Sequence, residues 1–160
     1  MDELSASATR VAEELRRRGI STNVVEMPES TRSAAEAAAA IGCDISQIVK
    51  SLVFRSVPGD APVLVLASGA DRVDEDRLAH LVGPVEQAPA KFVRARTGFA
   101  IGGVPPIGHA EAIETFLEEH LLDHDVVWAA AGTPRAVFSI EPRDLVALTS
   151  AKVVALAAAR

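Results

Sequence analysis

Two apolar stretches close together in the chain, Ile48–Ser56 and Val63–Ala67, place the strongest constraint on the fold. Pro58, Gly59 and Asp60 lie between them, and short apolar runs bounded by such turn residues are typical of β-strands. The second run is almost continuously apolar, which is typical of a strand buried on both faces. We therefore predict that the two strands pair as a hairpin.

The first of these strands contains one unexpected residue, Lys50. Side chains alternate between the two faces of a strand, so Lys50 shares a face with Ile48, Leu52 and Phe54. Burying an ammonium group among apolar side chains is costly unless its charge is paired. The side chain either extends to solvent from the start of the strand, or it lies in a pocket floored by the apolar face and meets an anionic or carbonyl-bearing ligand.

Length and composition indicate one globular domain over residues 1–160, since 49% of the residues are hydrophobic. The net charge of −6 argues against a protein that coats duplex nucleic acid. The single cysteine, Cys43, excludes an internal disulfide and fits a reducing compartment. The sequence predicts neither a signal peptide nor a membrane span. We expect a cytoplasmic protein with no metal and no tightly held cofactor.

Helical spacing and capping residues predict helices beside these strands. Gly19 can end the first helix, Ser33 and Glu36 have capping-box spacing, and Asp74 can cap a third helix. The expected helices cover about residues 2–18, 33–41, 74–81 and 90–96, and a short strand is expected at 23–27. The last helix carries a basic cluster that is either a solvated face or a contact for an RNA backbone: Lys91, Arg94 and Arg96.

The segment Ile101–His109 holds three glycines and two prolines, so it forms neither a helix nor a central strand. It must be a shaped loop, which can present backbone N–H and C=O groups to a ligand. It has neither the glycine order of a dinucleotide-binding fingerprint nor the Gly-Lys-Ser/Thr of a P-loop.

Two other chemistries have weaker support. Cys43 could be a nucleophile, but packing at a helix end is the better interpretation, because no histidine is next to it in the sequence. His120 and His124 have a spacing that can bind zinc, yet no third ligand is indicated. We expect these two histidines on a solvated helical face together with Glu118, Glu119 and Asp123.

The order and spacing of several motifs resemble the YbaK/prolyl-tRNA-synthetase-associated domain family. The resemblance spans roughly Thr31 to Leu156 and rests on the following segments: Thr31 before an alanine-rich helix, Ile48–Phe54 with its lysine, Val63–Ala67, Gly98, and Gly102–Gly108. The tail is similar to the family's closing strand, strand, helix and strand, at Ala131–Gly132, Val137–Ile140, Pro142–Leu145 and Thr149–Val153.

This resemblance implies an α+β fold: a single domain with a bent, mixed or antiparallel, barrel-like sheet edged by helices. It also implies a trans-editing hydrolase that deacylates mischarged aminoacyl-tRNA, most often a small amino acid on tRNA-Pro. The implied partners are the acceptor end of the tRNA with its terminal adenosine and a prolyl-tRNA synthetase. The amino acid removed stays open, because pocket volume decides it.

The resemblance also implies site residues. Lys50 matches the family's functional lysine, Gly102 and Pro106 match the ends of its Gly-x-x-x-Pro motif, and Ser51 takes a place usually held by threonine. The catalytic candidates are Lys50, Gly102 and Gly103, and the substrate-binding candidates are Thr31, Ser51, Val104, Pro106, His109 and Asp144. His109 is equally suited to a rim, specificity or catalytic role, and the hydroxyl of Thr31 could instead cap the following helix.

Ester hydrolysis needs a positioned water and donors aimed at the developing oxyanion, and the glycine loop is suited to supply the donors. The family implies water positioned with help from the substrate's ribose hydroxyl. A non-catalytic module that binds the tRNA acceptor end or a synthetase is the alternative, because a fold can keep a site and lose its chemistry. Hydrolysis of another small aminoacyl ester or amide is a third option.

Overall fold

A computed structural model describes residues 4–159 of the chain. Its strands form one mixed eight-stranded sheet in the order β1-β7-β6-β2-β3-β5-β8, with β4 paired to β2 beside this path. The strands are β1 (Val25–Glu26), β2 (Ile48–Ser56), β3 (Pro62–Ser68), β4 (Val85–Gln87), β5 (Glu114–Glu118), β6 (Val127–Ala130), β7 (Ala136–Ile140) and β8 (Lys152–Val154). This mixed α and β architecture confirms the predicted fold class.

The helices are α1 (Ala6–Arg17), α2 (Ala34–Ile41), α3 (Glu75–Val82), α4 (Ala90–Thr97) and α5 (Pro142–Thr149), with 3-10 turns η1 (Ile45–Gln47) and η2 (Glu119–Asp123). The predicted caps are confirmed: the side chain of Ser33 accepts from the N–H of Glu36, and that of Asp74 accepts from Arg77. The start of the expected first helix, at residues 2 and 3, lies outside the described residues. Between residues 4 and 159, no helix combines the length and apolar character that crossing a bilayer requires.

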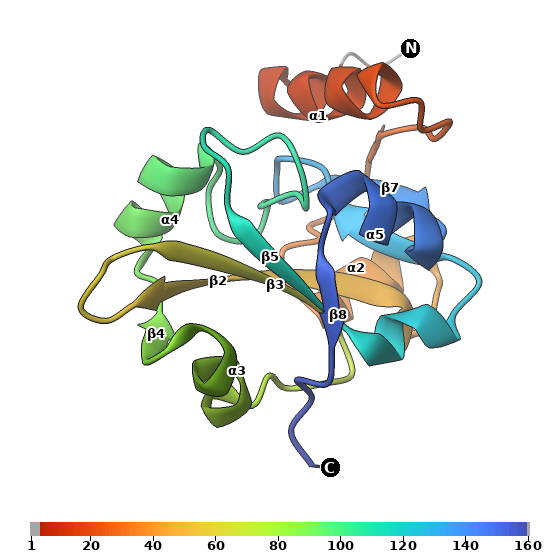
Figure 1. Ribbon diagram of the computed structural model, residues 1–160. Coiled ribbons are helices and arrows are strands. Elements are labelled where there is room, and N and C mark those ends of the chain that lie inside the picture. The colour runs from red at the N-terminus through yellow and green to blue at the C-terminus, as the bar shows by residue number, and fades with distance from the viewer. Residues whose placement is uncertain (1–3, 160) are drawn as a thin grey trace.

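The predicted hairpin is the centre of the sheet. Strands β2 and β3 pair antiparallel over seven residue pairs, from Val49 opposite Ser68 to Arg55 opposite Pro62. Strand β3 is buried along almost its whole length, as its continuous apolar run predicts. Figure 1 shows the hairpin running across the middle of the molecule, with α1 and the C-terminus at opposite ends.

Apolar side chains pack on both faces of this sheet. Leu64 and Leu66 of β3 face a core that includes residues of α1 and α5, such as Leu15 and Leu145. The alternate residues of β3, among them Val65, face a second core with Phe54 and Leu78. Side chains alternate along β2, so Lys50 and Phe54 point to the same face of the sheet, and Lys50 lies on the side of the second core.

Two predicted features of the tail are wrong in detail. Ala131 and Gly132 follow β6 and lie in the turn before β7, because the strand ends at Ala130. The last predicted strand begins at Lys152, since α5 continues to Thr149. The Gly132 backbone lies so close to Ser7 that a Cβ there would be 2.9 Å from the Ser7 carbonyl oxygen, which explains a glycine in this turn.

Candidate active site

The site forms where the edge of β2 is left uncovered. On the side away from β3, β6 pairs with Ile48 and Val49, and β4 pairs with Phe54 and the two residues after it. Among residues 4–159, no strand therefore lies beside the middle of β2 on this edge. Because antiparallel ladders alternate and the C=O of Val53 accepts from Ala88 on this side, the N–H and C=O of Ser51 also point into the gap.

Two adjoining cavities occupy this gap, with volumes of about 330 and 490 Å³. They share a wall made by β2 and the glycine-rich loop, at Lys50, Ser51, Leu52, Ile101, Gly102 and Val104. The smaller cavity continues toward α3 and β4, and the larger one toward α2 and β6. Five of the nine predicted site residues line the larger cavity: Thr31, Lys50, Ser51, Gly102 and Val104.

Lys50 lies in the wall between the cavities. Of the two positions that the sequence allowed, this is the one in a pocket. Its Nζ donates a hydrogen bond to the main-chain oxygen of Asp71. Burial lowers the pKa of Lys50, the Asp71 carboxylate opposes this by raising it, and the nearby Arg72 lowers it further. The site therefore holds a partly desolvated cation, whose bonds to a ligand are stronger than they would be in water.

Close packing explains the two glycines of the loop. Gly102 has φ of +93°, and a Cβ there would lie 2.5 Å from Cγ of Arg32. A Cβ on Gly103 would lie 2.7 Å from the main-chain carbonyl carbon of Thr133. The loop is thus held between the segment before α2 and the turn before β7, and Gly102, unlike Gly103, lines the cavities.

Thr31 connects the same two segments. Its N–H and its hydroxyl both donate to the main-chain oxygen of Pro134, at 2.7 and 3.0 Å. The hydroxyl therefore does not cap α2, which Ser33 caps. The role of Thr31 in this structure is to fix the wall of the larger cavity.

Ser51 has a buried hydroxyl for which the described part of the chain offers no hydrogen-bond partner. Such groups are uncommon in folded proteins, because an unpaired buried hydroxyl costs about 1–3 kcal/mol. Its position in the shared wall of the cavities is consistent with a bond to a ligand or water.

Of the four other predicted site residues, Gly103 packs against the main chain of Thr133 without lining either cavity, and three lie elsewhere. Pro106 and His109 line a separate cavity with Arg18 and Thr149. Nε2 of His109 donates to the Pro105 carbonyl at 2.7 Å, and burial lowers the pKa of His109 while that hydrogen bond raises it. Asp144 is exposed in the first turn of α5, and it lines neither cavity at β2. The structure therefore does not bring His109 or Asp144 to Lys50.

The competing candidates do not line the two cavities. Cys43 packs beside α2, and burial raises the pKa of its thiol, which disfavours the nucleophilic thiolate. In the basic cluster of α4, Arg96 donates to Glu111 at 2.8 Å and to the main-chain oxygen of Asp60 at 2.9 Å. None of the three basic residues of α4 is among the residues lining the two cavities.

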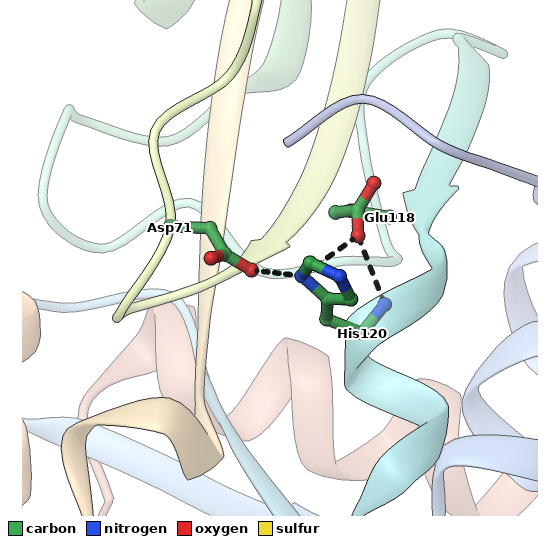
Figure 2. A group of neighbouring side chains, drawn as sticks. All are labelled: Asp71, Glu118 and His120. Carbon is green, nitrogen blue, oxygen red and sulfur yellow. Dashed lines mark hydrogen bonds and ion pairs between the residues drawn. The ribbon is translucent and has the colours of Figure 1, made fainter. Parts of the chain in front are cut away.

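The prediction for Glu118 is wrong. Instead of lying on a solvated face, Glu118 is 1% exposed and joins Asp71 and His120 in a cluster whose ligand-type atoms lie within 4.8 Å of one another (Figure 2). The pairing of β3 with β5 brings these residues together, because Asp71 follows β3, Glu118 ends β5, and His120 lies in the next turn, η2.

The chain matches the family model described as "Aminoacyl-tRNA editing domain" over residues 28–148. It belongs to that family. It is 31% identical to "Uncharacterized protein YwhH" of Bacillus subtilis, over 82% of this chain and 83% of that one. It is 28% identical to "Putative Cys-tRNA(Pro)/Cys-tRNA(Cys) deacylase EbsC" of Enterococcus faecalis, over 76% and 75% of the two chains.

Among solved structures, one titled "Crystal structure of a putative trans-editing enzyme for prolyl tRNA synthetase" is 49% identical. It superposes with a TM-score of 0.92 over 98% of this chain and all of that one. The family and these relatives indicate aminoacyl-tRNA editing or deacylase activity, and a hydrolase at the level of the family.

The editing domain has cavity residues that the sequence did not reveal as site residues. Arg32 lines the larger cavity, Arg72 the smaller one, and Trp128 the part of the larger cavity beside β6. The sequence could have indicated Arg72 as a site residue, because it is a polar residue shortly after a buried strand. No sequence pattern indicated Trp128 as a site residue, since an aromatic residue in a strand is usually part of the core.

Proposed function

We propose that this editing domain hydrolyses the ester of a mischarged aminoacyl-tRNA, in which a small amino acid is attached to tRNA-Pro. The observation that carries the proposal is the meeting of Lys50 with the backbone of the Gly102 loop across the open edge of β2. The deacylase and trans-editing names of the relatives support the choice of substrate.

In the proposed reaction, the oxygen of a water attacks the carbonyl carbon of the aminoacyl ester. The bond from that carbon to the ribose oxygen breaks, and the ribose oxygen leaves with a proton. The N–H of Gly102 and the main-chain N–H of Ser51 are the proposed neutral donors for the oxyanion, because the N–H of Gly103 already donates to the Ala100 carbonyl at 3.0 Å. The Lys50 ammonium adds a charge-assisted bond to the carbonyl or to the terminal phosphate.

Water is the proposed nucleophile because the cavities offer little else. In the described part of the chain, the residues lining them include no cysteine and no histidine. The hydroxyl of Thr31 is engaged with Pro134, and that of Ser33 with the N–H of Glu36. Ser51 also lines both cavities, but no histidine lies among the described lining residues to take the proton of its hydroxyl. The ribose hydroxyl of the substrate is the proposed group that positions the water.

A prolyl-tRNA synthetase is the proposed partner that delivers the mischarged tRNA, in the cytoplasm where tRNA is aminoacylated. The overall negative charge of the chain, −6, favours such delivery, because it weakens unassisted attraction to RNA.

The test is multiple-turnover deacylation of tRNA-Pro carrying Cys, Ala, Ser or Pro, with the wild type beside Lys50→Ala. We expect release from at least one mischarged species, with Pro-tRNA spared, and a loss of about a hundredfold or more in kcat for the variant. Unchanged melting temperature controls for folding. Release that is indifferent to Lys50 would contradict the assignment, and tRNA binding without release would favour a non-catalytic acceptor-end module.

A further inference from the structure

The turn after β3 determines where the Lys50 ammonium lies. This turn is held to β2 and η1 at its start, where the N–H of Gly69 donates to Ile48 at 2.7 Å and the hydroxyl of Ser68 donates to Ser46 at 2.8 Å. Two residues on, the main-chain oxygen of Asp71 accepts from Nζ of Lys50. The position of that oxygen therefore depends on what holds Asp71.

The side chain of Asp71 is held on the opposite side by His120. Its Oδ2 lies 2.8 Å from Nδ1 of His120 (Figure 2). A carboxylate only accepts hydrogen bonds, so Nδ1 carries the hydrogen and donates it. The Asp71 side chain is 1% exposed and that of His120 is 44% exposed, so a buried carboxylate is paired with a group reachable from solvent.

Glu118 in turn fixes His120 and the C-terminal segment. Its Oε1 accepts from the N–H of His120 at 2.9 Å and lies 3.3 Å from Nδ1 of the same residue. Its Oε2 accepts from the N–H groups of Leu156 and Ala157. The C-terminal segment completes the support, because the N–H of Ala158 donates to the main-chain oxygen of Arg72 at 2.7 Å.

We propose that Asp71, braced by His120 and Glu118, is a positioning residue that holds the Lys50 ammonium toward the gap in the sheet. Asp71 touches no reacting atom and acts in two ways. Its side chain anchors the turn that carries the acceptor oxygen, and its negative charge favours the protonated form of Lys50. This inference rests on the proposed function for its activity readout only.

The hydrogen bonds favour a brace over a metal site. Oε2 of Glu118 already accepts from two main-chain N–H groups, and His120 directs a hydrogen rather than a lone pair at Asp71. The cavity beside His120 also contains Asp123 and His124, so metal binding is included below as an outcome that would overturn the proposal.

The first experiment compares Asp71→Ala with the matched control Asp123→Ala, an exposed aspartate of η2 beside the same cavity. Asp71→Ala retains a main-chain oxygen at this position, but it removes the side chain that anchors the turn and the negative charge of that side chain. We expect kcat for mischarged tRNA to fall about ten- to a hundredfold with KM little changed, because a displaced catalytic group costs turnover. Wild-type kcat in Asp71→Ala would overturn the proposal.

A second readout does not depend on activity. The chain has three lysines, so the ¹³Cε signal of Lys50 can be assigned with Lys91→Arg and Lys152→Arg variants and titrated by NMR. The charged groups near Lys50 are Asp71 and the four that line the cavities with it: Arg32, Glu36, Arg72 and Glu75. Removing Asp71 removes the group that raises the pKa of Lys50, so we expect this pKa to fall in Asp71→Ala and to stay unchanged in Asp123→Ala. An unchanged pKa of Lys50 in Asp71→Ala would overturn the proposal, even if the wild type deacylates no tRNA.

His120 provides the third readout, because its exposure makes substitution tolerable if Asp71→Ala does not fold. His120→Asn places an amide N–H near Nδ1 and should keep kcat close to wild type, whereas His120→Ala should lower it about tenfold. Equal, wild-type kcat in both variants would overturn the brace. Loss of wild-type activity with a chelator, restored by Zn²⁺ and absent in His120→Ala, would also overturn it and assign a metal site.

Discussion

At the scale of single residues, the site combines groups that a stable core would exclude. Lys50 is a cation on an apolar strand face, and Ser51 has a buried hydroxyl without a hydrogen-bond partner among the described residues. Both are unfavourable for folding by themselves. Their meeting in one cavity wall is typical of a binding or catalytic site, where local stability is sacrificed for ligand contacts.

The two loop glycines should respond differently to alanine. In Gly102→Ala the new Cβ meets the side chain of Arg32, which is exposed and can move, so we expect a folded protein destabilised by about 1–2 kcal/mol, mainly from the positive φ. In Gly103→Ala the Cβ meets the main chain of Thr133, which cannot move separately, and we expect a larger loss, at the upper end of the range of about 1–3 kcal/mol. Urea unfolding measures both. Equal stability of the two variants would contradict the packing described for this loop.

His109 should make the protein less stable in acid. Burial lowers its pKa from 6.5 in the folded chain, so the unfolded chain takes up the proton first as the pH falls. This contribution to stability is complete above the unfolded pKa, decreases as the pH drops below it, and stops decreasing below the folded pKa. His109→Gln keeps a neutral donor for Pro105, so its melting temperature should drop about 2 °C less than that of the wild type between pH 7.5 and 5. The exposed His80→Gln is the control, and an equal drop in all three proteins would refute the effect.

At the scale of elements, the interrupted edge of β2 is the feature that makes a site. A strand usually needs partners along both edges inside a sheet, and here β6 and β4 cover only its two ends. The uncovered middle leaves backbone donors and acceptors for a ligand, and the loop from Ile101 to Val104 closes the opening. The turn after β3 and the end of β5 then support this edge from the far side.

Glu118 links the end of β5 to the C-terminal segment, and we expect this link to contribute to the stability of the fold. Glu118→Gln replaces an oxygen that accepts main-chain N–H groups with an amide donor, so at least one N–H loses its partner. We expect the free energy of unfolding to fall by about 1–3 kcal/mol, measured by urea denaturation. Glu119→Gln, an exposed neighbour, should change stability by less than about 0.5 kcal/mol. A similar result for both variants would show that the buried carboxylate does not tie the C-terminal segment to β5.

At the scale of the whole molecule, the net charge of −6 opposes binding to RNA, while three cations line the cavities. The chain has 22 acidic and 16 basic residues, yet Arg32, Lys50 and Arg72 all line the gap. Within the described residues, neither arginine forms an ion pair with a carboxylate. These three cations are the positive groups placed to meet an acceptor end that enters the gap.

The affinity for tRNA should consequently depend only weakly on salt. Three cations meeting the single-stranded acceptor end predict a slope of about −2 for the logarithm of the binding constant against that of the salt concentration. Fluorescence anisotropy with a labelled tRNA between 50 and 300 mM KCl measures it. Arg32→Ala should make the slope less negative by about one, whereas Arg94→Ala on α4 should leave it unchanged. A much steeper wild-type slope would indicate contacts along the tRNA duplex.

The local elements were accessible from the sequence, since each depends on residues close together in the chain. The hairpin followed from two apolar runs and a turn, the helix starts from Ser33 and Asp74, and the loop from its glycines and prolines. The resemblance to the family led to Lys50, Gly102 and Thr31, all of which line the gap.

Only the tertiary structure decided which distant groups meet. Lys50 and Asp71 are 21 residues apart, and Asp71 and His120 are 49 apart, so their contacts depend on the order and register of β2, β3 and β5. For the same reason Glu118 became a buried link, while His109 and Asp144 lie away from Lys50. Local patterns determine helices and strands through neighbours along the chain, but the site depends on which strand edges stay unpaired after the sheet has formed.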